Sequence, residues 1–242
     1  MKILGLLGGV ASGKSLVARQ LAELGAVVLD ADRTGHEALR LPRIEESARQ
    51  RWGDAVFGPD GHIDRSRLAK IVFAPPPNGP RERKYLEELT HPEIGRRLSA
   101  QAEALKTRFG EGLPTPPTRP TEGLPSAGRP SVGGVARSET SHNSGVGAIR
   151  AVTPLAVLDA ALIVEAGWDK LCDCFAFVDV PQELRLARAL QRGWTEGDFA
   201  ARETAQESLD SKRARADVII DNSGSADHTQ AQVKRLWQFL VG

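Results

Sequence analysis

The residues that most clearly carry chemistry lie near the start of the chain and fit the phosphate-loop pattern G-x-x-x-x-G-K-[ST]. Gly8 begins this pattern, and Lys14 and Ser15 end it. Backbone N–H groups in such a loop surround an anion, Lys14 reaches toward the β- and γ-phosphates of a nucleotide, and the Ser15 hydroxyl coordinates Mg²⁺. The predicted phosphate-binding residues are therefore Gly9, Val10, Ala11, Ser12, Gly13, Lys14 and Ser15.

Acidic side chains follow two apolar segments. Asp30 and Asp32 come after residues 26–29, and Asp159 lies within the apolar segment 155–163. Ligands of an open parallel sheet bind beyond the carboxyl ends of its strands, so these acids should face the phosphate loop. We expect Asp32 to accept a proton or support Mg²⁺, and Asp159 to support Mg²⁺. If the extended path continues past residue 29, Asp30 and Asp32 share one side; alternatively, both aspartates form a turn or cap a helix.

The elements around the phosphate loop have the order that this chemistry needs. Residues 3–7 form an apolar run typical of a buried parallel strand, and apolar residues at helical spacing follow Ser15 until Gly25. The alternative is a glycine-rich turn between a strand and a helix, but that reading leaves Lys14 and Ser15 at the helix start unexplained.

The remaining ordered elements predict a mixed α/β chain. Residues 34–106 are mostly helical, with one helix ending near His91 and another beginning at Pro92. Strands are expected over residues 175–181 and 216–222, and a helix over 183–191. Arg188 and Arg192 are four residues apart and share one face of that last helix, which is either a phosphate-facing surface or a solvated basic one. His91 either contacts substrate or caps a helix.

Residues 107–150 differ in composition from the rest of the chain. More than half of them are Gly, Pro, Ser or Thr, and Phe109 is the only aromatic residue. A segment of this kind cannot bury enough apolar surface to offset the entropy lost on ordering. We predict a disordered insertion rather than a domain.

Composition limits the kinds of partner and cellular location that the chain is expected to have. The chain has 242 residues, 40% of them hydrophobic, and a net charge of +1, which gives no reason to expect nucleic acid or an acidic membrane as a partner. The two cysteines, Cys172 and Cys174, are too close for a favourable disulfide and too few for a zinc site. With no signal peptide or apolar membrane span visible, a cytoplasmic location is expected.

Taken in order, the motifs resemble those of one family, the dephospho-CoA kinases. The resemblance is carried by residues 5–15, 29–32, 89–92 and 159–165, by Arg188, Arg192 and Gln206, and by residues 216–222. It implies ATP-dependent phosphorylation of the ribose 3′-hydroxyl of dephospho-CoA, the last step of coenzyme A synthesis, with Mg²⁺. Leu7 and Leu16 stand where the family usually has Thr, and neither departure removes Lys14 or Ser15.

The resemblance also implies an architecture. We expect a P-loop NTPase-type three-layer sandwich with a parallel central sheet, built from residues 1–33 and 151–242, with a lid at about 183–206. Residues 34–106 would form a helical region that binds the CoA part of the substrate. The protein is expected to act as a monomer on a small molecule, without nucleic acid or membrane partners.

Residue roles follow from the matching motifs. Asp32 corresponds to the catalytic base, Lys14 and the loop amides hold ATP, and Ser15 completes the metal site with Asp159. Arg188 and Arg192 match the lid. Two further expectations follow from the resemblance. His91 should lie on the substrate side of the site, and Asn222 should lie near the adenine.

Two rival functions remain open at this point. Another small-metabolite or nucleoside kinase could use the same phosphate loop, because only the helical region and lid choose the acceptor. A non-catalytic nucleotide-binding module would lack an acceptor base and lid arginines, whereas Asp32, Arg188 and Arg192 are all present.

Overall fold

The structure is a computed structural model, and it describes residues 1–110 and 154–242. Most of the predicted 107–150 insertion therefore lies outside the described residues. Residues 107–110 are the exception, since they form the end of helix α5 (Asn78–Gly110) instead of belonging to a loop.

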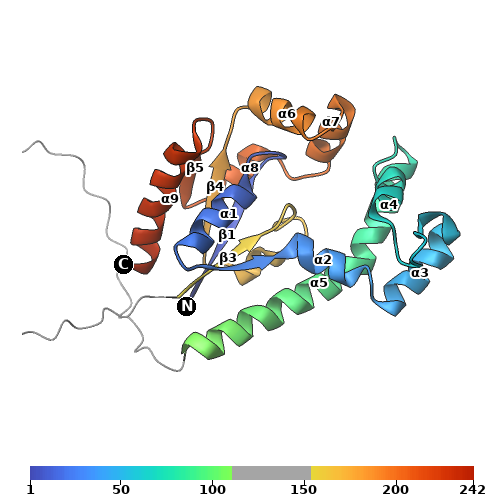
Figure 1. Cartoon of the computed structure of the whole chain (residues 1–242), viewed down its shortest axis with the longest axis horizontal. Helices are drawn as coiled ribbons and strands as arrows, with labels where there is room; N and C mark the ends of the chain where they lie inside the picture. Colours follow the sequence, from blue (N-terminus) through green and yellow to red (C-terminus); the bar gives the residue numbers. More distant parts are fainter. Residues whose placement is uncertain (111–153) are drawn as a thin grey trace, which may run out of the picture.

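A five-stranded parallel sheet forms the centre of the molecule, in the order β2-β3-β1-β4-β5 (Figure 1). All strands are short and mostly apolar, as expected for strands covered on both faces. Their bounds are β1 Lys2–Gly8, β2 Val27–Asp30, β3 Leu155–Asp159, β4 Cys174–Asp179 and β5 Val218–Asp221. The sheet confirms the predicted α/β fold. The strand predicted over residues 155–163 is shorter than expected and ends at Asp159.

Two apolar clusters cover the two faces of the sheet. On one face, β1 residues Leu4 and Leu6 pack with helices α1 (Lys14–Glu23) and α9 (Ala226–Val241). On the other face, Ile3 and Leu7 pack with Leu98 of α5. Alternate residues of β1 thus point to opposite faces, as the pleat requires. The phosphate loop between β1 and α1 is anchored on both sides by buried structure.

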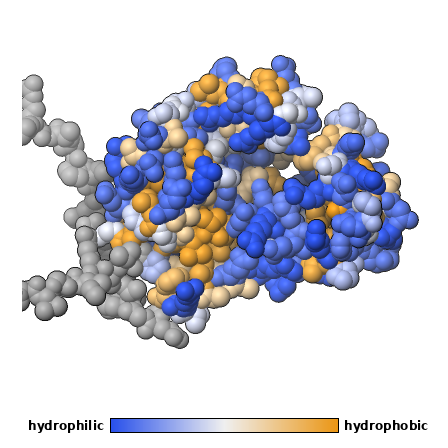
Figure 2. All heavy atoms as spheres, viewed as in Figure 1, coloured by the Kyte–Doolittle hydropathy of each residue, from blue (hydrophilic) through white to orange (hydrophobic). Residues whose placement is uncertain are grey.

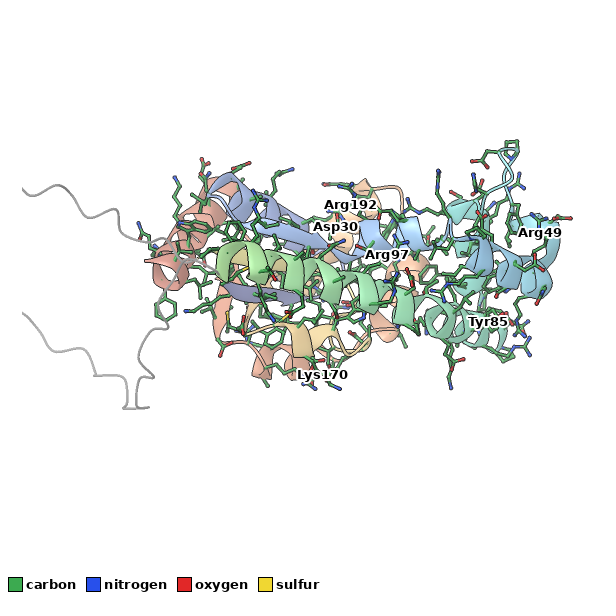
Figure 3. The ribbon with its side chains drawn as sticks, turned by 90° about the horizontal axis from the view of Figure 1, so that it is seen from below. Asp30, Arg49, Tyr85, Arg97, Lys170 and Arg192 are labelled. Carbon is green, nitrogen blue, oxygen red and sulfur yellow. The ribbon has the colours of Figure 1, made fainter. Side chains whose placement is uncertain are left out.

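Helix α5 runs through Pro92, so the prediction that one helix ends and another begins there is wrong. Proline removes one helical hydrogen bond and usually bends or stops a helix. Here Ile94, Leu98 and Ala102 bury one face of the segment after Pro92 against the sheet, and packing outweighs the lost bond. Seen from below, α5 extends from the sheet to the part of the molecule that carries Arg49 and Tyr85 (Figure 3).

The path after β2 also differs from the extended alternative. Asp30 ends β2 and caps α2 (Ala31–Ala38), accepting a hydrogen bond from the Arg33 N–H at 2.8 Å. Asp32 therefore lies in the first turn of a helix and not on a continued strand. The capping alternative holds for Asp30, and it leaves Asp32 free for another role.

The other helices form two separate groups (Figure 1). One group lies at the far end of α5 and contains α3 (Pro42–Trp52), the short η1 (Gly53–Val56) and α4 (Arg65–Val72). The other follows β4 and contains α6 (Gln182–Gln191) and α7 (Glu196–Thr204), whereas α8 (Leu209–Ala214) packs against the sheet at β1. The short η2 (Trp168–Leu171) packs beside α5. Within the described residues, no helix has the length and apolar character needed to cross a membrane.

Candidate active site

A cavity of about 720 Å³ lies at the carboxyl end of the sheet, between the α6–α7 region and the helices that follow β2. Figure 2 shows the surface hollowed between these two parts of the molecule. Most of the predicted site residues line this cavity together: residues 10–15, Asp32, His91, Asp159 and Arg192. Gly9, which belongs to the loop itself, lies outside the cavity lining, and so do Arg188 and Asn222, which lie against the loop near Gly13.

The phosphate loop holds Lys14 at its centre. The Lys14 Nζ donates hydrogen bonds to the carbonyl oxygens of Gly8 at 3.1 Å and Gly9 at 3.2 Å. Desolvation by burial lowers the pKa of Lys14 from 10.5 to about 8, and the nearby carboxylates of Asp159 and Asp32 only partly offset it. An ammonium group in this setting lacks a close anionic partner, and a triphosphate would supply one.

Gly13 is required where it stands. Its φ of 92° lies in the left-handed region, and an added Cβ would collide with the side-chain amide of Asn222. Glycine alone satisfies both conditions without strain. The next residue, Lys14, starts α1, so the loop amides and the helix N-terminus face the same space.

Asn222 supports the loop through its side chain, and its expected place near an adenine stays a prediction. Its side chain is buried, with Nδ2 donating to the Ser12 carbonyl oxygen at 2.8 Å and Oδ1 accepting from the Thr229 hydroxyl at 2.7 Å. Arg188 donates from NH2 to the Asn222 carbonyl oxygen at 2.8 Å. Both residues therefore hold the loop, and Arg188 does not share the cavity-facing position of Arg192.

Asp32 faces the cavity from the first turn of α2. Burial raises the pKa of its carboxyl group, the charge of Asp30 raises it further, and His36, Lys14 and Arg65 act in the opposite direction. A carboxylate with a raised pKa accepts a proton more readily than an ordinary aspartate does. The position of Asp32 in the cavity and its raised pKa are compatible with the predicted base role.

Asp159 ends β3, which pairs with β2, and it lines the same cavity as Asp32. Burial raises the pKa of Asp159, while a hydrogen bond from Ser15 and the charge of Lys14 lower it. No group of three or more His, Cys, Asp or Glu side chains in residues 1–110 and 154–242 is arranged to hold a metal by itself. Mg²⁺ at a phosphate loop needs fewer, because substrate phosphates and water complete its oxygen shell. The two carboxylates and the Ser15 hydroxyl fit that donor set.

His91 lies in the middle of α5 and packs on Trp168, with ring centroids 5.4 Å apart. Both side chains line the cavity. Burial lowers the pKa of His91, which favours the neutral ring. His91 therefore belongs to the cavity wall and does not cap a helix.

Among the cavity residues that were not predicted as site residues from the sequence are an arginine and two tryptophans. Arg202 of α7, Trp194 before it and Trp168 of η2 all line the cavity. A sequence signal for Arg202 exists: Thr195 and Asp198 form a capping box, which marks the start of a helix and places Arg202 in its last turn. Each tryptophan directly follows a glycine, Gly167 or Gly193, and carries no periodic signal.

Arg185 also has a role that its sequence neighbours do not indicate. Its side chain is 2% exposed, forms an ion pair with Glu203 and donates to the carbonyl oxygens of Val180 at 3.2 Å and Val10 at 3.3 Å. Arg185 thus connects α6, α7 and the phosphate loop. Of the basic residues on α6, it is the most deeply buried.

The cysteines have no part in this site. Both thiols of Cys172 and Cys174 are free. Burial raises the pKa of Cys172 to about 12 and also raises that of Cys174, so both remain protonated near neutral pH.

Comparison with known proteins points to one family. A family model described as Dephospho-CoA kinase matches residues 2–110 and 141–228. The dephospho-CoA kinase of Symbiobacterium thermophilum is 36% identical over 245 residues, covering 100% of this chain and 82% of that protein. The dephospho-CoA kinase of Bacillus licheniformis is 33% identical over 237 residues, covering 97% of this chain and 94% of the relative.

Solved structures agree in fold. The crystal structure of TT1252 from Thermus thermophilus has a TM-score of 0.64 at 28% identity and covers 100% of this chain and 98% of its own. A dephospho-CoA kinase from Campylobacter jejuni has a TM-score of 0.56 at 18% identity, covering 99% of this chain and 97% of its own, a likeness of fold alone.

Proposed function

Because the chain belongs to the dephospho-CoA kinase family, we propose that its cavity transfers the terminal phosphoryl group of ATP to the ribose 3′-hydroxyl of dephospho-CoA. Family membership assigns the ATP-dependent phosphorylation of dephospho-CoA in coenzyme A synthesis. We propose in addition which atom accepts the phosphate, what each site residue does and that the metal is Mg²⁺.

The observation that carries the proposal is that Lys14 and Asp32 line the same cavity from two different elements. Lys14 projects from the start of α1 and Asp32 from the start of α2. Transfer from ATP to a hydroxyl needs a cation at the phosphates and a base at the acceptor, with the two substrates held in line. This pair of side chains meets that requirement.

Lys14 and the loop amides would bind the phosphates. Burial lowers the pKa of Lys14 despite the carboxylates of Asp159 and Asp32, so its charged form is only partly compensated, and the β- and γ-phosphates would add to that compensation. As the ammonium turns toward the phosphates, its hydrogen bonds to the carbonyl oxygens of Gly8 and Gly9 would be replaced.

Asp32 would orient the ribose hydroxyl and accept its proton as the oxygen attacks the γ-phosphorus. Its raised pKa favours that transfer. Arg192 would add positive charge from the lid side of the cavity. His91, half-buried and with a lowered pKa, would contact the acceptor as a neutral ring.

Asp159 and Ser15 would hold Mg²⁺. The bound metal would screen the charge that develops on the phosphates. The hydrogen bond between Ser15 and Asp159 keeps both oxygen donors together in the free protein. Arg188 and Asn222 would keep the loop in shape without touching either substrate. We further propose that the protein acts in the cytoplasm and as a monomer.

The experiment that tests the function is turnover by the purified protein with Mg·ATP and dephospho-CoA, followed by mass spectrometry and ³¹P NMR of the product. A single added phosphate at the 3′ position supports the proposal. Parallel reactions with nucleosides and with shikimate test other acceptors. A product phosphorylated elsewhere, or faster turnover of a rival acceptor, would refute it.

A further inference from the structure

One cavity residue bridges two parts of the molecule that are distant in sequence. The Arg202 guanidinium of α7 lies 4.3 Å from the ring centroid of Phe73 and 4.1 Å from that of Trp194. Phe73 is the C-cap of α4, in the helical group at the far end of α5, whereas Trp194 lies between α6 and α7. All three side chains line the cavity. We call them the arginine stack.

The residue next to Arg202 makes contacts in the other direction. Glu203 pairs with the buried Arg185, whose guanidinium also donates to the Val10 carbonyl oxygen of the phosphate loop. Of these two neighbouring residues of α7, Glu203 thus contacts the nucleotide side through Arg185, and Arg202 contacts the helical group through Phe73. Through α7, the phosphate loop and α4 are joined by a continuous series of contacts.

We infer that Arg202 is a positioning residue for phosphoryl transfer, which sets how α7 sits against the acceptor side of the cavity through the arginine stack. A guanidinium between two rings makes favourable contacts with both ring faces. One ring belongs to each side of the cavity, so α7 cannot move away from α4 without losing the Phe73 contact. The NH1 group also donates to the Asp198 carbonyl oxygen at 3.1 Å, which limits the rotation of the side chain.

This role differs from direct contact with phosphate. An arginine that binds phosphate acts through its charge and its hydrogen bonds to the phosphate oxygens, so losing the guanidinium should cost more than losing a neighbouring ring. A positioning residue acts through the stack, so removing a ring must reproduce the loss of the guanidinium. The inference rests on the kinase activity assigned above, and the variants below separate the two.

The test compares Arg202→Gln, Phe73→Leu and the double variant in steady-state turnover of dephospho-CoA. We expect each single variant to lower kcat about tenfold, equivalent to about 1.4 kcal/mol of activation free energy. The KM for Mg·ATP should stay within about twofold of the wild-type value, because Lys14 and the loop are unchanged. The double variant should be no slower than Arg202→Gln, since both changes remove one interaction. Phe73→Tyr retains a ring and should retain kcat.

The matched control is Arg49→Gln. Arg49 lies 4.0 Å from the ring centroid of Phe57, the same kind of contact outside the cavity lining, at the end of the molecule shown in Figure 3. Its kcat should equal that of the wild type. Trp194→Leu examines the stack from the lid side if Phe73→Leu does not fold.

Two results would overturn the inference. Wild-type kcat in Phe73→Leu combined with a loss in Arg202→Gln would assign Arg202 a direct charge role. If the fold-losses in kcat of the two single variants multiply in the double variant, the two residues act independently. Absence of turnover by the wild-type protein would instead refute the assigned activity, so the two failures are distinguishable.

Discussion

Asn222 donates a hydrogen bond to the carbonyl oxygen of Ser12 at 2.8 Å, joining the residue after β5 to a loop 210 residues earlier in the chain. The Thr229 hydroxyl, itself fully buried, fixes the other side of the amide. Because the amide also lies against Gly13, the shape of the phosphate loop depends on the last strand of the sheet.

Replacing Asn222 should therefore impair both stability and nucleotide binding. Asn222→Asp removes the donor and places a carboxylate beside the Ser12 carbonyl oxygen, so unfolding free energy should fall by about 1–3 kcal/mol. Affinity for Mg·ATP, measured by calorimetry, should fall as well. Thr229→Val is the matched control, because it should reduce stability while leaving the bond to Ser12 and most of the affinity intact. Unchanged Mg·ATP binding by Asn222→Asp would contradict the support role.

Lys14→Ala should abolish most turnover. It removes the cation that we assign to the β- and γ-phosphates, and we expect kcat to fall by at least about 100-fold, a loss of about 2.7 kcal/mol or more in transition-state stabilisation. The melting temperature should not fall, because burial of the Lys14 ammonium is unfavourable in the free protein. Lys234→Ala, at an exposed position on α9, serves as the control and should behave like the wild type. Retention of turnover by Lys14→Ala would exclude the assigned role.

The lowered pKa of Lys14 predicts a pH dependence with a definite sign. Between about pH 8 and 10.5 the folded protein binds fewer protons at Lys14 than the unfolded chain, so this group's contribution to stability rises with pH. Below pH 8 the penalty is fully present. Bound triphosphate favours the ammonium, so Mg·ATP binding at pH 8.5 should take up protons and weaken as pH rises. Calorimetry in buffers of different ionisation enthalpy measures this uptake, and Lys14→Arg should lose it. Equal uptake in the variant would assign the proton to another group.

Asp32→Asn should eliminate most of the acceptor chemistry while preserving ATP binding. The amide can still accept a hydrogen bond from the ribose hydroxyl but cannot take its proton, and we expect a fall in kcat of about 10²–10⁴-fold. Asp30→Asn serves for comparison, because asparagine also caps helices and Asp30 lies outside the cavity lining; it removes a charge that raises the pKa of Asp32, and its kcat should fall far less than that of Asp32→Asn. Near wild-type kcat in Asp32→Asn would remove the base assignment.

Asp159→Asn should raise the Mg²⁺ concentration needed for half-maximal turnover. Loss of one carboxylate leaves Ser15 and the substrate phosphates as the remaining ligands, and a shift of about tenfold or more is expected. The measurement is a Mg²⁺ titration at constant free ATP, with Asp179→Asn as the control for loss of an acid at the end of a strand. Asp179 ends β4 and pairs with Arg213 outside the cavity lining. An unchanged Mg²⁺ requirement in Asp159→Asn would place the metal elsewhere.

The phosphate loop and the parallel sheet could be predicted because their signals are local. Apolar runs define the strands, and the order of Gly13, Lys14 and Ser15 defines the loop. The positions of Asp32 and Asp159 followed from the rule that parallel strands end at the same edge. Their roles as base and metal ligand remain predictions.

The parts that could not be predicted depend on contacts between distant residues. Pro92 favours a helix boundary, but the buried face of α5 continues beyond it and only the folded sheet provides the packing partner. Arg188 and Arg192 share a face by spacing, yet Asn222 draws Arg188 toward the loop while Arg192 ends the helix at the cavity. The arginine stack joins Phe73 to Arg202, and no sequence period links them.

Helix α5 makes one side of the cavity, the acceptor side, more rigid than the other. At about 1.5 Å per residue its 33 residues span about 50 Å, as one unbroken rod. Its second half is embedded against the sheet, and its first half carries Glu82, which is bonded to Arg51 and Trp52 of α3. The acceptor side of the cavity is therefore a rigid extension of the sheet. We expect the admission and release of substrates to depend on movement of the α6–α7 region, which can separate from α4 only when Arg202 loses its contact with Phe73.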